Sequence, residues 1–229
     1  MRWGVVTFPG SLDDADAVYA LREVMGQDAV ALWHKDESLQ GAGCIVLPGG
    51  FSYGDYLRCG AIARFSPIMK SIIGFAADGG LVLGICNGFQ ILCEARLLPG
   101  ALTRNRSLSF VCEQVNLRVE NAKTPFTRSC RDRDLLRIPV KHGEGSYTAP
   151  ESEIRQLEER GQILLRYTDR TGVPTEATNP NGSLHSIAGI ANQRFNVCGL
   201  MPHPEHAVEA MLGGEDGRRI FQSIIDSAP

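Results

Sequence analysis

The sequence predicts an α/β fold in which a mostly parallel central sheet, flavodoxin-like in arrangement, is flanked by helices. Short apolar runs that end in Gly- or Pro-rich turns indicate buried strands, as at residues 44–47 and 81–83. Segments with apolar residues at helical spacing separate several of these runs, as at residues 13–25. Strands and helices that alternate in this way favour a parallel sheet, whose functional groups gather at the carboxyl ends of the strands.

Length and composition indicate one domain that spans residues 1–229. The net charge of −3 and the absence of a basic stretch argue against nucleic acid or a membrane as partner. No apolar run approaches the ~20 residues that span a bilayer, and the first residues have no signal-peptide layout. Seven scattered cysteines without C-x-x-C spacing indicate neither a disulfide framework nor a zinc site, so we expect a protein of the reducing cytoplasm.

The elements follow in order along the chain. Apolar runs predict strands over residues 3–8, 29–33, 44–47, 81–83, 135–140, 162–167, 187–191 and 197–201, with partly alternating strands over 108–119. Helical spacing predicts helices over residues 13–25, 67–77, 151–160 and 217–227, and another after Gly88. The strand at 135–140 is expected to end in a polar turn, Lys141-His142-Gly143-Glu144-Gly145. No repeat or long linker divides the chain.

The central motif is a strand, a tight turn and a helix with Cys86 at the apex. The turn reads Gly84-Ile85-Cys86-Asn87-Gly88, which has the form of a nucleophile elbow with sulfur in place of the serine oxygen. Its glycines allow the backbone to approach neighbouring elements closely. A helix N-terminus favours the thiolate form of Cys86. The alternative is a buried structural cysteine, which the flanking glycines make less attractive.

A second glycine-rich turn, Pro48-Gly49-Gly50-Phe51, follows the strand at 44–47. An N–H of this Gly-Gly pair, together with that of Asn87, is a candidate oxyanion hole; the alternative is a flexible loop. The following stretch, residues 52–60, brings Tyr, Asp and Arg side chains together. That stretch either meets a partner or gates the site, unless it is simply a solvated loop.

His203 and Glu205 follow the strand at 197–201, as Cys86 follows its own strand. Pro204 is expected to keep this segment extended, so that His203 faces Cys86 and Glu205 orients the imidazole. These are the roles of nucleophile, base and orienter in covalent acyl transfer. A surface pair is the alternative for His203 and Glu205. A metal site that also uses His142, Glu144 and His206 is disfavoured, because the spacings match no H-E-x-x-H pattern, and we expect no metal.

These motifs resemble the class I, triad-type glutamine amidotransferases, and more closely the glutaminase subunits of phosphoribosylformylglycinamidine synthases. The resemblance covers nearly the whole chain. It is carried by Gly84-Ile85-Cys86-Asn87-Gly88-Phe89-Gln90, by residues 48–61, by Asn105-Arg106-Ser107, by residues 139–145, by Asn179-Pro180-Asn181-Gly182-Ser183, by Met201-Pro202-His203-Pro204-Glu205 and by Leu212-Gly213-Gly214. The elbow marks only the superfamily, whereas the long loop after Gly50 and the His-Gly-Glu-Gly turn are more specific.

The resemblance implies hydrolysis of L-glutamine to glutamate and ammonia. In such enzymes the counterpart of Cys86 attacks the side-chain amide, that of His203 moves the protons and that of Glu205 orients the imidazole. The backbone amides of Gly50 and Asn87 are implied to hold the oxyanion. The implied substrate-binding residues are Gly49, Phe51, Gln90, His142, Gly143 and Glu144.

The resemblance also implies a partner. Ammonia would pass to a large synthetase subunit that uses ATP and Mg²⁺ to make formylglycinamidine ribonucleotide in de novo purine synthesis, and a small third subunit would bridge the two. No cofactor is implied for this chain, which has no P-loop. Two departures stand out: Leu12-Asp13 where relatives carry Asn-Cys, and His206 where they carry arginine. Neither is expected to touch the triad.

Two other classes of function remain open from the sequence. A cysteine peptidase, deglycase or chaperone on the same architecture would lack glutamine specificity, and Gln90 with the His142-Gly143-Glu144 turn argues against it. A non-catalytic scaffold would not need Cys86, His203 and Glu205 together.

Overall fold

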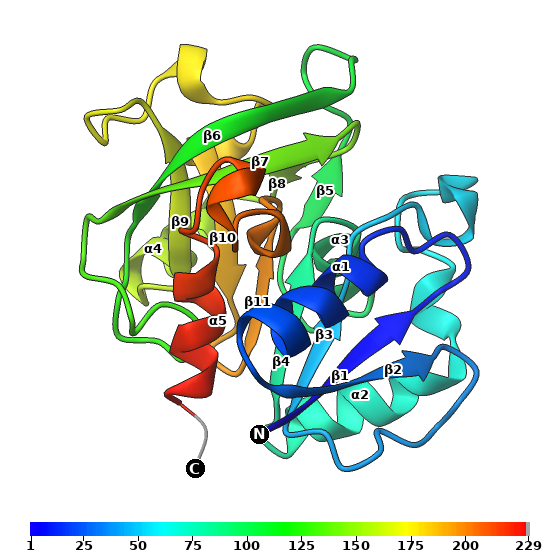
Figure 1. Cartoon of the computed structure of the whole chain (residues 1–229). Helices are drawn as coiled ribbons and strands as arrows, with labels where there is room; N and C mark the ends of the chain where they lie inside the picture. Colours follow the sequence, from blue (N-terminus) through cyan, green and yellow to red (C-terminus); the bar gives the residue numbers. More distant parts are fainter. Residues whose placement is uncertain (228–229) are drawn as a thin grey trace.

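A nine-stranded sheet runs through the centre of the molecule in the computed structural model, which describes residues 1–227 (Figure 1). The order across the sheet is β2-β1-β3-β4-β11-β10-β9-β6-β7. The strands are β1 (Arg2–Thr7), β2 (Asp28–Trp33), β3 (Cys44–Leu47), β4 (Leu81–Ile85), β6 (Val111–Val119), β7 (Leu135–His142), β9 (Ile163–Thr168), β10 (Ile187–Ala191) and β11 (Val197–Leu200). A separate pair is formed by β5 (Ala101–Thr103) and β8 (Ser146–Thr148).

The strand pairings confirm the predicted α/β fold with a mostly parallel sheet. β2, β1, β3, β4 and β11 pair in parallel, and the remaining pairs are antiparallel. As a result, every strand of this sheet except β6 and β10 points in one direction. The carboxyl ends of β1, β3, β4, β11 and β7 therefore lie at the same edge, where the candidate site residues are found.

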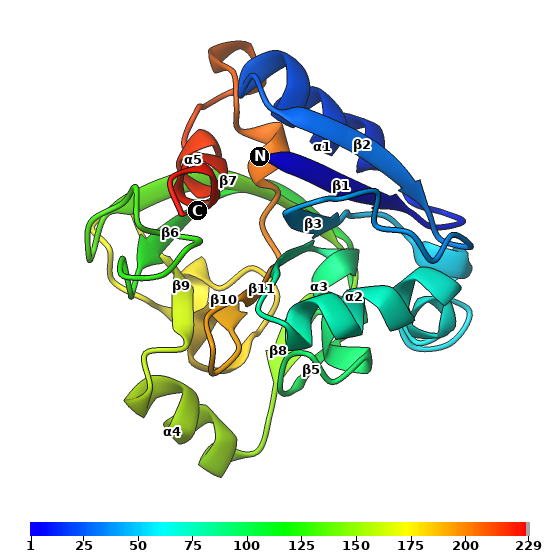
Figure 2. The ribbon, with the colours of Figure 1, turned by 90° about the horizontal axis from the view of Figure 1, so that it is seen from below.

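Helices cover both faces of the sheet (Figure 2). They are α1 (Asp14–Tyr19), α2 (Pro67–Ala77), α3 (Asn87–Glu94), α4 (Glu151–Glu159) and α5 (Arg218–Ile225). α1 and α5 lie on one face, and α2 and α3 lie on the other. Fully buried aromatic side chains pack between the layers. Trp3 meets Phe221 edge-on with ring centroids 6.2 Å apart, and Phe89 stacks on Tyr147 with ring centroids 5.9 Å apart. Burial of such large apolar surfaces is what favours this layered packing.

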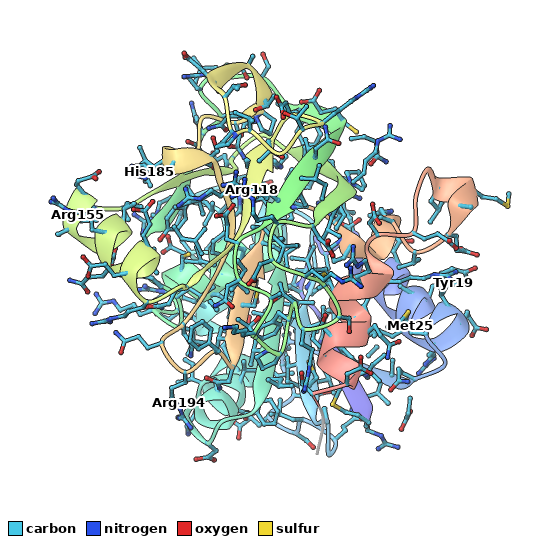
Figure 3. The ribbon with its side chains drawn as sticks, turned by 90° about the vertical axis from the view of Figure 1, so that its left-hand side faces the viewer. Tyr19, Met25, Arg118, Arg155, His185 and Arg194 are labelled. Carbon is cyan, nitrogen blue, oxygen red and sulfur yellow. The ribbon has the colours of Figure 1, made fainter. Side chains whose placement is uncertain are left out.

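The predicted elements lie within a few residues of the observed ones, and two differ in an informative way. The helix predicted over residues 13–25 begins as α1 and ends in a wider π-helical turn at Ala20–Val24. In Figure 3, Tyr19 and Met25, which flank this π-helical turn, lie on one side of the molecule, and Arg155 of α4 lies on the other. The strand predicted to end at Val140 continues through His142 as β7, because Lys141 and His142 pair with Cys112 and Val111 of β6.

The far edge of the sheet curls back over the centre. β7 is the last strand in the hydrogen-bonding order, yet the Pro139 carbonyl accepts a hydrogen bond from the His203 amide, 2.8 Å away, beyond the end of β11. This curl brings the end of β7 against the ends of β4 and β11. Within residues 1–227, no helix is both long enough and apolar enough to cross a membrane.

Candidate active site

Cys86 occupies a strained turn between β4 and α3. Its φ of 50° and ψ of −104° are uncommon for a residue with a side chain. The backbone is held there because the Cys86 amide donates to the Leu200 carbonyl at 2.8 Å. Gly88 is needed because a Cβ at this residue would stand 1.9 Å from the Leu47 carbonyl oxygen. The predicted elbow is therefore present, and it holds the thiol at the carboxyl edge of the sheet.

His203 and Glu205 form a buried pair beside this elbow. His203 Nδ1 lies 2.6 Å from Glu205 Oε1, and Nε2 has no hydrogen-bond partner among the described residues. Burial of the imidazole disfavours its charged form, but its interactions with the Glu205 carboxylate and with Cys86 outweigh burial and raise the pKa of His203. Glu205 thus fixes Nδ1 as the donor, which leaves Nε2 for the thiol of Cys86.

The expected extended geometry of this segment is wrong. Pro204–His206 form a 3₁₀ turn, with the proline at its first position, where a missing N–H costs nothing. The turn folds Glu205 back toward the ring of His203. The carboxylate therefore reaches Nδ1 through the turn, not through the alternation of an extended strand.

Two backbone amides near Cys86 have the properties that the predicted oxyanion hole needs. The Gly50 amide makes no hydrogen bond to another residue within 1–227. The Asn87 amide is the first of α3, where no intrahelical acceptor exists. Gly50 has a φ of 141°, and a Cβ there would lie 2.6 Å from the Gly10 carbonyl oxygen, so only glycine fits. Their role as oxyanion donors stays a prediction.

A cavity of about 410 Å³ opens onto Cys86. Five of the predicted substrate-binding residues line it: Phe51, Gln90, His142, Gly143 and Glu144. Gly49 does not, because it packs against the imidazole, where an added Cβ would lie 2.7 Å from His203 Cε1. A larger hollow of about 580 Å³ near α4 contains no predicted site residue. The cavity that contains the thiol is therefore the candidate substrate site.

Gln90 and His142 shape the wall of this cavity through hydrogen bonds to protein groups. Gln90 accepts from Asn87 Nδ2 at 2.8 Å and donates to the Glu144 carbonyl at 2.5 Å, which ties α3 to the turn after β7. His142 Nε2 lies 3.0 Å from Asn181 Nδ2. Burial, assisted by His203, lowers the pKa of His142 to about 3, so its ring is neutral at physiological pH. Direct contact of these side chains with substrate stays a prediction.

The structure adds lining residues that the sequence did not single out as site residues. They are Leu12, Asp13, Asp55, Cys59, Phe110 and Lys141. Cys59 Sγ donates to Glu144 Oε2 at 3.1 Å, and burial together with this contact raises the pKa of the Cys59 thiol. The cavity therefore holds two cysteines, of which Cys59 is a protonated thiol. The cluster of Tyr, Asp and Arg over residues 52–60 was the signal for part of this wall.

The two departures from the family pattern do touch the triad, contrary to expectation. Asp13 Oδ2 lies 3.6 Å from His203 Nδ1, and Asp13 Oδ1 lies 3.2 Å from His206 Nε2. Lys141 Nζ also donates to Asp13 Oδ1. Burial alone would raise the pKa of Asp13, but His206, His203 and Lys141 together lower it to about 2. The sequence could not show this contact because the three segments are far apart along the chain.

Four of these side chains lie close enough to suggest a cation. One atom from each of Asp13, His203, Glu205 and His206 falls within 4.8 Å of the others. The Lys141 ammonium already supplies positive charge to Asp13, so the cluster does not require a metal to balance it. That the chain holds no metal stays a prediction.

Comparisons with known proteins agree with this geometry. Residues 1–214 match the family model GATase_5, described as the CobB/CobQ-like glutamine amidotransferase domain. The chain is 57% identical over 225 residues to phosphoribosylformylglycinamidine synthase subunit PurQ from Salinibacter ruber, covering 98% of this chain and 96% of that protein. The corresponding Moorella thermoacetica subunit is 56% identical, with 99% and 96% covered. Among solved structures, a chain of PurLQS from Thermotoga maritima superposes with a TM-score of 0.87 at 44% identity, covering 98% of this chain and 97% of that one.

Proposed function

This chain belongs to the family of CobB/CobQ-like glutamine amidotransferase domains, and we propose that it is the glutaminase subunit of a phosphoribosylformylglycinamidine synthase in purine biosynthesis. It hydrolyses L-glutamine to glutamate and ammonia. The likeness to subunits of that name extends over nearly the whole of both chains, so the comparison is between whole subunits and not between shared fragments. The free state of all seven cysteines fits a reducing cytoplasm as its location.

The observation that carries the proposal is the buried His203–Glu205 pair with Nε2 unpartnered beside Cys86. In the first half of the reaction, the Cys86 sulfur attacks the side-chain carbonyl carbon of glutamine, and His203 Nε2 takes the thiol proton. The amides of Gly50 and Asn87 stabilise the resulting oxyanion. The carbon–nitrogen bond then breaks, His203 returns its proton to the departing nitrogen, and ammonia leaves a γ-glutamyl thioester.

The second half releases glutamate. His203 Nε2 takes a proton from water, whose oxygen attacks the thioester carbonyl. The carbon–sulfur bond breaks, and the sulfur of Cys86 recovers the proton. The Glu205 carboxylate stabilises the imidazolium at Nδ1, which is the role of an orienting carboxylate in a triad. His142 lies in the wall of the cavity with a neutral ring and takes no part in this proton transfer.

The cavity offers polar groups suited to the amino-acid end of glutamine. Asp55 and Glu144 line it, and burial raises the pKa of Asp55 while its Oδ1 has no hydrogen-bond partner in residues 1–227. A partly buried carboxylate with one unpartnered oxygen gains from an ammonium group, which the α-amino group of glutamine provides. We assign the α-amino end of the substrate to this part of the cavity.

The mouth of the cavity suits a protein partner. Leu12, Phe51 and Phe110 line it, yet they are 61%, 43% and 55% exposed. The rings of Phe51 and Phe110 lie 6.3 Å apart, which makes a continuous apolar rim. Apolar side chains gathered around a polar site are typical of docking surfaces. We propose that the synthetase subunit covers this rim and receives the ammonia, with a small third subunit bridging the two.

ATP and Mg²⁺ belong to the partner in this proposal. The chain has no glycine-rich phosphate-binding loop in its sequence, and its own chemistry from glutamine to ammonia needs no nucleotide. The energy of ATP is required only where ammonia joins the formylglycinamide ribonucleotide.

Labelling by a glutamine-mimicking diazoketone tests the proposal. We expect a single adduct at Cys86, identified by peptide mapping and suppressed by excess glutamine. Cys59 is the internal control, since it lines the same cavity as a protonated thiol. The Cys86→Ala variant should take no label and should lose glutamine-dependent synthesis in the assembled enzyme while keeping ammonia-dependent synthesis. Labelling spread over other cysteines, or continued ammonia release by Cys86→Ala, would refute the assignment.

A further inference from the structure

Asp13 occupies the position of a helix-capping residue, but its side chain does not cap the helix. It immediately precedes α1, where an aspartate ordinarily accepts hydrogen bonds from the first helical amides. Its side chain makes no such bond. The carboxylate turns inward instead and is almost completely buried, with 4% of the side chain exposed. Burying a carboxylate costs free energy unless charged groups compensate, so this inward orientation needs a reason.

The compensating groups come from two other elements. Lys141 of β7 and His206 of the 3₁₀ turn both contact Asp13 Oδ1. The second oxygen, Oδ2, is left facing His203 Nδ1 at 3.6 Å, and Gly49 has no side chain that would intervene. His203 therefore has a carboxylate at hydrogen-bond distance, Glu205, and a second carboxylate just outside it.

We propose that Asp13 is a positioning residue for His203. With Lys141 and His206 as its anchors, it places a second carboxylate beside Nδ1, the nitrogen that Glu205 already contacts. The two carboxylates stabilise the imidazolium that forms when Nε2 accepts the proton of Cys86. This role rests on the proposed glutaminase function and deepens it, because it assigns part of the general-base strength to a residue outside the triad.

The charges around His203 are few and can be separated. Glu205 and Cys86 act on it directly, His142 lies on the β7 side as a neutral ring, and the ring of His206 lies 5.6 Å away. Asp16 of α1 is 3.7 Å from His206 Nε2. It is about half exposed, and no contact of it with His203 is present. Asp16→Asn is therefore a matched control that removes a nearby negative charge without touching His203.

Ring-proton NMR of the full chain measures the effect without requiring catalysis. The chain has five histidines, and His203→Gln identifies the signal of His203. In Asp13→Asn we expect the pKa of His203 to fall by about one unit, because an opposite charge within 4–6 Å typically shifts a pKa by one to three units. Asp16→Asn should leave it unchanged. Lys141→Met should raise it, because the full charge of Asp13 then acts on His203.

The same variants are then assayed for glutamine hydrolysis in the complex with the synthetase. The acid limb of the kcat/KM profile should move to lower pH in Asp13→Asn and to higher pH in Lys141→Met, because it reports the pKa of His203 as the base. Simple loss of packing would lower kcat/KM in both variants without moving the limb. An unchanged His203 pKa in both variants would overturn the proposal. If Asp13→Asn fails to fold, Lys141→Met alone decides. A shifted pKa in a chain that hydrolyses no glutamine would keep the proposal and refute the glutaminase function.

Discussion

Gly88 lies directly against the carbonyl oxygen of Leu47, with no room between them for a side chain. A Cβ on Gly88 would stand 1.9 Å from that oxygen, well inside the distance that any real contact allows. The first turn of α3 can approach the end of β3 this closely only because residue 88 is glycine. This contact sets the direction of α3 and thereby the position of Cys86 relative to Gly50.

Replacing Gly88 by alanine is therefore expected to destabilise the fold and to displace the thiol. Inserting a methyl group into a packed region costs about 1–3 kcal/mol, and a rigid carbonyl places this site at the upper end. Urea unfolding measures the loss. Gly74→Ala is the control, because Gly74 lies in α2 with no atom within 4 Å of its Cβ position. It should stabilise the chain by roughly 0.5–1 kcal/mol. Equal stability of the two variants would contradict the prediction.

The charge of Glu205 is expected to matter more than its shape. Glu205→Gln keeps an acceptor for His203 Nδ1 but removes the charge that raises the pKa of the imidazole. We expect kcat for glutamine hydrolysis in the complex to fall by up to about 10⁴-fold, the loss that follows when the orienting carboxylate of a triad is replaced by its amide. The acid limb of the pH profile should also move to lower pH, since the imidazole then stays neutral and able to accept the thiol proton down to a lower pH.

A second glutamate–histidine pair in the same chain serves as control. Glu158 Oε1 lies 3.0 Å from His185 Nδ1, on the surface of the molecule, and His185 projects outward (Figure 3). Glu158→Gln should leave kcat and the pH profile unchanged. A comparable loss in both variants would show that the Glu205 result reflects general damage and not the triad.

The apolar rim of the cavity is expected to control how tightly the synthetase partner binds. Phe110→Ser removes one ring of the Phe51–Phe110 pair without touching Cys86 or His203. Titration of the chain with the synthetase should show weaker binding, by about tenfold or more, while diazoketone labelling of saturated complexes stays normal. Met211→Ser is the control, because Met211 is 98% exposed and does not line the cavity. Equal binding by both variants would exclude the rim as the docking surface.

The sequence predicted most of the fold because its signals are local. Apolar runs with glycine-rich ends marked β3 and β4, and helical spacing marked α2 and α4. The elbow was visible because its glycines are needed within a few residues of Cys86. The pairing of His203 with Glu205 was predicted for the same reason, since their short spacing can be read along the chain.

What the sequence could not predict depends on contacts between distant segments. The curl of β7 toward β11 allows the His203 amide to donate a hydrogen bond to the Pro139 carbonyl, and no local sequence pattern at either residue predicts this contact. The same curl brings Lys141 to Asp13, which also contacts His206, and the expected independence of Asp13 and His206 from the triad was wrong. The 3₁₀ turn at Pro204 was missed because a proline is compatible with both an extended segment and the first residue of a helical turn.

The buried charge of Asp13 predicts a specific loss of stability in acid. Its pKa in the folded chain is about 2, below the value near 3.9 of an unfolded aspartate. A lowered pKa contributes stability that is complete above the unfolded value and is lost as the pH falls through the folded value. Between pH 5 and pH 2 the free energy of unfolding should therefore fall by about 2 kcal/mol more in the wild-type chain than in Asp13→Asn.

Urea unfolding at a series of pH values measures this difference directly. Every other carboxylate titrates in both proteins, so the gap between the two curves isolates Asp13. Asp16→Asn should follow the wild-type curve, because that side chain is half exposed. Parallel curves for wild type and Asp13→Asn would mean that Asp13 is not ionised against Lys141, His206 and His203. The electrostatic basis for its action on His203 would then disappear, because a protonated Asp13 carries no charge to stabilise the imidazolium.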